Sequence, residues 1–220
     1  MQKFIFIFLW LSFATSTVWG QSIQLQLGRS NQDNFFVKAG YMHSFGERFS
    51  VGLEGQYGQH RYRFIGAKAI PEGNVSWVGV PIRYQAFVND AIRLDLYLRS
   101  RLRFTSSTTD AVVLRSTALE FDPALIISLP INSQWEVQSG LILKTILEVE
   151  PNVLLEQQVS SLLLLGLNYA PSDRLALSLQ GQAGPTSGAG GDTMKFYSFL
   201  QLGLAYSFGE RSALSQFMLY

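Results

Sequence analysis

The feature of this sequence that most constrains its fold is a two-residue alternation of apolar and charged side chains over residues 92–104. Successive side chains on a β-strand point to opposite faces, so this stretch would form a strand with one apolar and one ionic face. The apolar face would carry Leu94, Leu96, Leu98 and Leu102, and the ionic face Arg93, Asp95, Arg99, Arg101 and Arg103. Repeated along the chain, such segments are typical of a transmembrane β-barrel.

The first twenty residues have the order of a secretion signal. Lys3 precedes an apolar run over residues 4–14, and a cleavage zone follows it with Val18 and Gly20 as plausible recognition residues. This order predicts a signal peptide over residues 1–20 with cleavage before Gln21. The apolar run is shorter than the roughly 20 residues that a transmembrane helix needs. Because the chain has no cysteine, disulfides and thiolate metal sites are excluded.

The charge content favours a membrane over water. Charged residues make up 15% of the chain, whereas soluble domains average about 25%. Too few charges are present to coat a soluble, secreted β protein, which is the alternative interpretation. The 17 basic and 16 acidic residues nearly balance, so bulk electrostatics predict no nucleic-acid partner.

Turn residues divide the chain into ten candidate strands. We place them at 22–29, 35–45, 48–63, 74–88, 91–105, 113–130, 134–149, 157–170, 173–184 and 194–208. Tight turns alternate with longer connections, as between the periplasmic and outer ends of transmembrane barrels. The prediction is an all-β, antiparallel, up-and-down transmembrane barrel over residues 21–208, with ten strands, or eight as the alternative. The Gly-rich segment 184–193 is predicted to be a mobile outer loop, and residues 209–220 a periplasmic tail or a segment in the lower lumen.

Strand parity then predicts which side chains face lipid. Leucines occupy the middle of the outward face, with aromatic residues such as Phe45, Trp135, Phe104 and Phe196 towards its two ends. Aromatic residues at both edges of an aliphatic band are typical of the two membrane interfaces.

The inward face is predicted to hold an ion-pair network. Its members are Glu54, Arg83, Arg93, Asp95, Arg99, Arg101, Arg103, Glu120, Asp122 and Lys144. We expect Glu120 to lie roughly opposite Lys144, and Arg99 and Arg101 to pair with Glu120, Asp122 or Glu54, because charges in a narrow interior must be paired. Such pairs would largely plug the lumen. The alternative is a narrow channel whose arginines favour anions.

The sequence gives little support for catalysis. His43 and Ser44 are neighbours, which places them on opposite faces of a strand. His60 would lie near the outer end, but no spacing fixes contact with Asp110, Glu148 or Glu150. We therefore predict a non-enzymatic protein without a cofactor or metal site. An outer-membrane hydrolase that depends on His60 is the second alternative.

Two segments resemble a known family. With the signal, the strand WVGVPIRY at 77–84 and the closing GLAYSF at 203–208 resemble the small outer-membrane β-barrel proteins of Bacteroidota, a PorT-like or generic porin-family group. This resemblance implies residence in the cell outer membrane, contact with its lipid and insertion by the barrel-assembly machinery. It also implies an envelope protein without an assigned activity, whose outer loops could bind an unknown extracellular ligand.

Overall fold

The computed structural model describes residues 20–30, 35–61, 72–108, 113–148, 158–188 and 195–208. The predicted signal peptide, apart from Gly20, and the predicted tail 209–220 lie outside these residues. Ten strands are present: β1 (Gln21–Ser30), β2 (Phe35–Phe45), β3 (Phe49–Arg61), β4 (Glu72–Val88), β5 (Arg93–Thr108), β6 (Val113–Pro130), β7 (Trp135–Glu148), β8 (Gln158–Ser172), β9 (Leu175–Gly188) and β10 (Lys195–Ser207). No helix among the described residues is long and apolar enough to cross a membrane.

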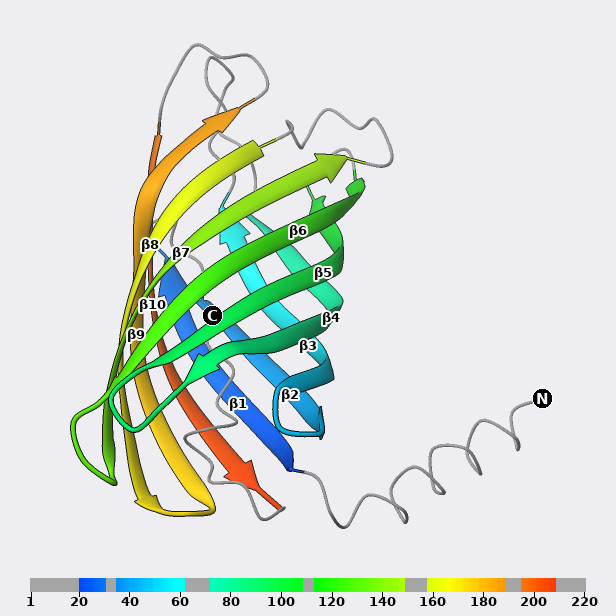
Figure 1. Cartoon of the computed structure of the whole chain (residues 1–220). Coiled ribbons are helices and arrows are strands. Elements are labelled where there is room, and N and C mark those ends of the chain that lie inside the picture. Colours follow the sequence, from blue (N-terminus) through cyan, green and yellow to red (C-terminus); the bar gives the residue numbers. More distant parts are fainter. Residues whose placement is uncertain are drawn as a thin grey trace, which may run out of the picture.

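The strands form one closed antiparallel barrel in which each strand pairs with its sequence neighbours (Figure 1). The barrel closes between β1 and β10, from Ser22 opposite Ser207 to Ser30 opposite Phe199. The ten-stranded prediction is confirmed, and the eight-stranded alternative is wrong. Every strand has 10 to 18 residues, and a tilted strand needs about 9–11 to cross a bilayer.

The tight turns owe their shape to particular residues. Gly46, between β2 and β3, has a φ of 65°, a conformation that glycine adopts without steric cost. Between β4 and β5, the Asn89 side-chain oxygen accepts hydrogen bonds from the backbone N–H groups of Ala91 and Ile92, at 2.9 and 2.8 Å. Asn132 does the same between β6 and β7. Asparagine favours turns because it can form such local bonds.

One predicted loop is partly strand. The Gly-rich segment was expected to leave the sheet at residue 184, but β9 continues to Gly188. Thr186 pairs with Ser160 of β8 on one side and with Lys195 of β10 on the other. Pairing on both sides satisfies backbone groups that the glycine content alone would leave to solvent. Residues 189–194 lie outside the described part.

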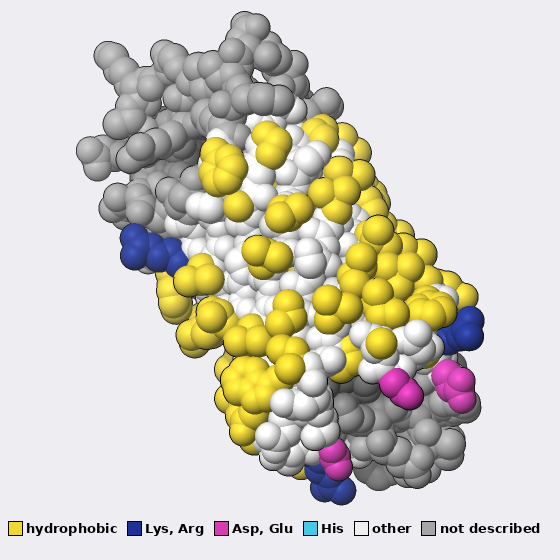
Figure 2. Space-filling model, turned by 60° about the vertical axis from the view of Figure 1, so that its left-hand side comes forward, with side chains coloured by type: hydrophobic (Ala, Val, Ile, Leu, Met, Phe, Trp, Pro, Cys, Tyr) yellow, Lys and Arg dark blue, Asp and Glu magenta, His cyan; other side chains and the backbone are white. Residues whose placement is uncertain are grey.

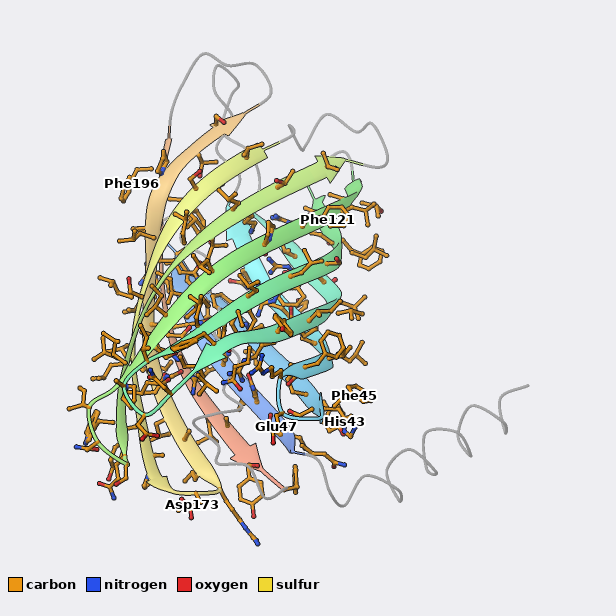
Figure 3. The ribbon with its side chains drawn as sticks, in the orientation of Figure 1. His43, Phe45, Glu47, Phe121, Asp173 and Phe196 are labelled. Atoms are coloured by element: carbon orange, nitrogen blue, oxygen red, sulfur yellow. The ribbon has the colours of Figure 1, made fainter. Side chains whose placement is uncertain are left out.

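The described outer surface of the barrel exposes many large apolar side chains, and Figure 2 shows them spread over one face. Leu53, Leu163 and Leu202 are 58%, 56% and 60% exposed, as expected for side chains that face hydrocarbon. In Figure 3, Phe121 and Phe196 project outward near the upper end, and His43 and Phe45 lie near the lower end. Glu47 lies beside His43 in the turn between β2 and β3, and Asp173 lies at the lower end of the barrel in the turn between β8 and β9 (Figure 3). The predicted apolar band with aromatic edges is therefore present.

Three prolines interrupt the hydrogen-bonded ladder without shifting its register. Pairing between β3 and β4 skips Pro81 opposite Gly52, that between β6 and β7 skips Pro123 opposite Leu143, and that between β8 and β9 skips Pro185 opposite Ser161. Proline has no N–H, so each partner carbonyl loses one ladder bond. A closed barrel has no edge strand that could accommodate these prolines.

Candidate functional site

The interior of the barrel is the candidate site, and its charged residues form two groups. The turn-side cluster comprises Arg83, Arg93, Asp95 and Glu136, close to the tight turns. Arg83 donates from Nε to Asp95 Oδ1 and from Nη2 to Asp95 Oδ2, both at 3.0 Å. Arg93 bridges Asp95 at 2.9 Å and Glu136 at 3.0 Å. Two arginines and two carboxylates from β4, β5 and β7 are thus connected.

Uncharged groups complete the turn-side cluster. Glu136 Oε1 accepts hydrogen bonds from Gln138 at 2.6 Å and from Asn168 at 3.0 Å. Ser128 accepts hydrogen bonds from Gln138 and Arg93. Buried ions are tolerated when their remaining donors and acceptors are also satisfied, which is the arrangement here.

The central cluster lies further from the turns. It comprises Lys38, Glu54, Arg99, Arg101, Arg103, Glu120, Asp122 and Lys144, of which all but Lys144 are at most 8% exposed. Arg103 Nη1 lies 2.7 Å from Glu120 Oε1, and Arg101 Nε lies 3.3 Å from Glu120 Oε2. Arg101 also contacts Asp122 and stands over the ring of Trp77, 4.6 Å from its centroid. Cation and aromatic ring attract each other in this geometry.

The ten predicted network members all lie in the interior, Arg83, Arg93 and Asp95 in the turn-side cluster and the other seven in the central cluster. Arg99 Nε lies 2.6 Å from Glu54 Oε1, reaching across the intervening strand β4. Glu120 pairs in register with Ile146 rather than Lys144, yet Lys144 Nζ lies 3.7 Å from Glu120 Oε2. Lysine spans this two-residue offset because its side chain is long. Lys38 and Glu136 also belong to these clusters, although they were not among the predicted network members.

Amides line much of the opposite wall. Gln24 and Gln26 of β1, Gln180 and Gln182 of β9, and Gln201 of β10 are buried. Gln201 donates a hydrogen bond to Gln180 across the β9–β10 pair. The interior is therefore ionic along β2–β7 and uncharged along β1, β9 and β10 among the described side chains.

Sequence reasoning missed an apolar core inside the barrel. Ile126, Ile142, Leu162 and Leu164 point inward and are at most 1% exposed. They pack in a cluster with Met42, Tyr97 and several alanines. The sequence predicts a polar lumen because that prediction rests on the alternation of apolar and polar residues. The continuous apolar run at residues 162–165 shows no such alternation. A continuous apolar run indicates a strand whose two faces are both in apolar surroundings, here the barrel interior on one side and lipid on the other.

An aromatic stack crosses β1 towards the outer end. The rings of Phe36 and Phe199 are parallel, with centroids 5.0 Å apart and an interplanar angle of 7°. Gly28 lies between them on β1, paired with Phe36, and a Cβ at this position would overlap the Phe36 ring. The missing side chain of Gly28 is what allows the two rings to meet.

The candidate catalytic residues do not assemble among the described side chains. His43 lies on the outer face, with its ring 4.5 Å from that of Phe45, whereas Ser44 is buried and hydrogen-bonded to Ser50 at 2.9 Å. The side chains of His60 and Glu148, and all of Asp110 and Glu150, lie outside the described part. No group of three metal-ligating side chains occurs in the part of the chain described.

Comparisons with protein-family models and with curated proteins found no match. Several solved structures are similar in fold. The outer membrane protease OmpT from Escherichia coli is 10% identical, with a TM-score of 0.48 over 88% of this chain and 98% of that chain. The β domain of the Bordetella autotransporter BrkA is 12% identical, with a TM-score of 0.44 over 87% and 99%. The N-terminal barrel domain of Pseudomonas aeruginosa OprF is 13% identical, with a TM-score of 0.38 over 86% and 97%.

At such identities and TM-scores these likenesses carry no argument about function, and the PorT-like resemblance stays a prediction. The class follows from the chain's own structure. A closed antiparallel barrel satisfies its backbone internally, exposes an apolar band and encloses polar groups. This is the fold of an outer-membrane β-barrel protein.

Proposed function

We propose that this protein is a resident of the cell outer membrane whose barrel is closed to solutes and serves as a scaffold for its outer connections. The observation that carries this proposal is the filled interior. A water-filled pore leaves its charged lining accessible, as in large porins. Here Arg99, Asp95 and Glu120 are at most 2% exposed, and Ile126 and Leu164 are fully buried in the same interior.

Single-channel recording in planar bilayers tests the closed state. The purified full chain is expected to give no discrete current steps, while a general porin reconstituted in the same way does. Discrete steps that change in ion preference when Arg99 and Arg101 are replaced by glutamine would instead support the narrow, anion-favouring channel. The alternate arginines of β5 are the observation that favours this second candidate.

We further propose that the protein is not an enzyme and that its partners are outer-membrane lipid, the barrel-assembly machinery and an extracellular ligand. The apolar outer face supports lipid contact, and the opposite orientations of His43 and Ser44 argue against a catalytic pair. Fractionation should recover the chain with the outer membrane, released only by detergent. A lipase or protease activity that disappears in His60→Ala would overturn the non-enzymatic proposal.

A further inference from the structure

The end of the barrel that carries the tight turns has an uneven lining. On β4, β5 and β7 the inward side chains near this end are large and charged, namely Arg83, Arg93 and Glu136. On six other strands, which are contiguous around the barrel (β8–β10 and β1–β3), the last inward residue at this end is always a serine or an alanine. We call this set the turn-end wall, and its members are Ala170, Ala176, Ser207, Ser22, Ser44 and Ser50.

The turn-end wall is covered although its own side chains are small. Each of its residues is at most 6% exposed, and Ala176, Ser22 and Ser207 are 0% exposed. An eight-stranded barrel has an interior that side chains just fill, so a ten-stranded barrel is wider than serines and alanines can fill. Across the lumen, Arg93 and Glu136 are held by partners on β5–β8, namely Asp95, Ser128, Gln138 and Asn168. The wall therefore needs a cover that these two side chains do not supply.

Two hydroxyl groups on this side of the barrel add a second requirement. The Ser22 Oγ atom has no hydrogen-bond partner among the described residues, and neither has that of Ser178, two residues beyond Ala176 on β9. Both serines are at most 6% exposed. A buried hydroxyl without a partner is costly, and such groups in native proteins are normally satisfied. The cover should therefore carry polar groups as well as apolar ones.

The chain itself supplies a segment at this place. Residues 209–220 follow Phe208, whose backbone N–H donates to the Gln21 carbonyl at 2.8 Å, so the segment begins beside β1, within the arc of the wall. Fully extended, its twelve residues span up to roughly 40 Å, so it can reach every part of the wall.

The composition of residues 209–220 matches the wall. The two charges, Glu210 and Arg211, come first, where the barrel opens, and residues 212–220 carry no charged side chain. Burying an uncharged segment avoids the desolvation cost of an ion. The segment combines large apolar side chains, such as Leu214 and Phe217, with the hydroxyls and amide of residues 212, 215 and 216. Both kinds of group that the cover needs are present.

We propose that residues 209–220 fold back into the barrel and bind the turn-end wall. Their apolar side chains cover the alanines, and their polar groups serve the buried hydroxyls of Ser22 and Ser178. The segment is thus an internal plug that closes the barrel at the end with the tight turns. This inference extends the closed barrel proposed above, but its test detects the segment itself, whether or not the barrel conducts.

Thiol labelling of the purified chain in detergent tests the plug, because the native chain has no cysteine. Ala176→Cys should react with a charged methanethiosulfonate at least tenfold more slowly in the full chain than in a chain shortened after Phe208. A synthetic peptide of residues 209–220 should restore protection to the shortened chain, and a scrambled peptide should not. Ser133→Cys, in an exposed turn, is the control and should react equally fast in both chains. Gel mobility without heating shows that the shortened barrel is folded.

Each other pattern contradicts the proposal. Slow labelling of Ala176→Cys in both chains would show that the barrel covers its own wall. Fast labelling in both would show that residues 209–220 do not cover it. Protection in cells that is lost on purification of the full chain would assign the wall to a different protein.

A second measurement needs no shortened chain. Phe217→Asp places a charge in the uncharged part of the segment and should speed the labelling of Ala176→Cys at least tenfold, because burying a carboxylate without a partner is costly. Glu210→Gln, which changes the charge by one unit at the start of the segment, should leave the labelling rate unchanged. Equal labelling rates in these two variants would overturn the proposal even if the shortened chain failed to fold.

Discussion

The carboxylate of Glu120 illustrates how the interior accommodates its charges. Its two oxygens face Arg101, Arg103 and Lys144, and the residue is 1% exposed. Removing the carboxylate leaves three cations with less counter-charge in a dry environment. A buried ion pair adds little net stability, whereas breaking one by removing a partner is strongly destabilising.

Glu120→Gln is therefore expected to lower the free energy of unfolding by about 3 kcal/mol or more. Urea unfolding of the refolded barrel in detergent, followed by its gel mobility without heating, measures the change. Asp173→Asn, at an exposed turn, is the control and should leave the free energy unchanged. Equal stability of the two variants would show that Glu120 does not hold the cluster together.

At Gly28 the constraint is steric. A Cβ there would overlap the Phe36 ring and come within 2.9 Å of the Leu200 backbone oxygen. Gly28→Val should destabilise the barrel by about 1–3 kcal/mol, as overpacking does. Adding Phe36→Ala should recover part of that loss because it removes one of the two clashes. Thermal unfolding of the single and double variants tests this, and purely additive losses would contradict it.

Among the strands, β6 shows how a proline inside a closed sheet lowers the free energy of unfolding. Pro123 faces the Leu143 carbonyl of β7 but has no N–H to donate. In hydrocarbon an unsatisfied carbonyl is expensive. Pro123→Ala should complete the ladder bond and raise the free energy of unfolding by about 1 kcal/mol. The backbone amide that this substitution introduces should also be protected from hydrogen exchange. A less stable variant with a rapidly exchanging amide would contradict this account.

The sequence predicted the strands because alternation is a local property. The segments 35–45 and 113–130 match β2 and β6 in full, and parity placed Arg99 and Glu120 inside. What it could not predict depends on barrel closure and register. Contact between Glu54 and Arg99 requires a side chain to cross β4, and the apolar core around Leu162 and Leu164 lies where alternation is absent. The end of β9 was misplaced because pairing on both sides outweighs glycine content.

For the molecule as a whole, the alternation of short and long connections predicts its orientation in the membrane. The tight turns should face the periplasm. Because the native chain contains no cysteine, single substitutions can report this directly. Ser106→Cys, near the outer end of β5, should react with a membrane-impermeant maleimide on intact cells. Ser133→Cys, in the turn after β6, should react only after the outer membrane is permeabilised. The reverse pattern would invert the orientation.

The uncharged interior of β1 and β10 has a consequence for assembly. No ion pair among the described residues joins these two strands, and their described inward side chains are amides, hydroxyls and small or aromatic groups. Strands β1 and β10 can therefore pair or separate without forming or breaking an ion pair between their described side chains. The ion pairs of β2–β7 can form first, and the final closure then adds backbone hydrogen bonds, uncharged side-chain contacts and the Phe36–Phe199 stack.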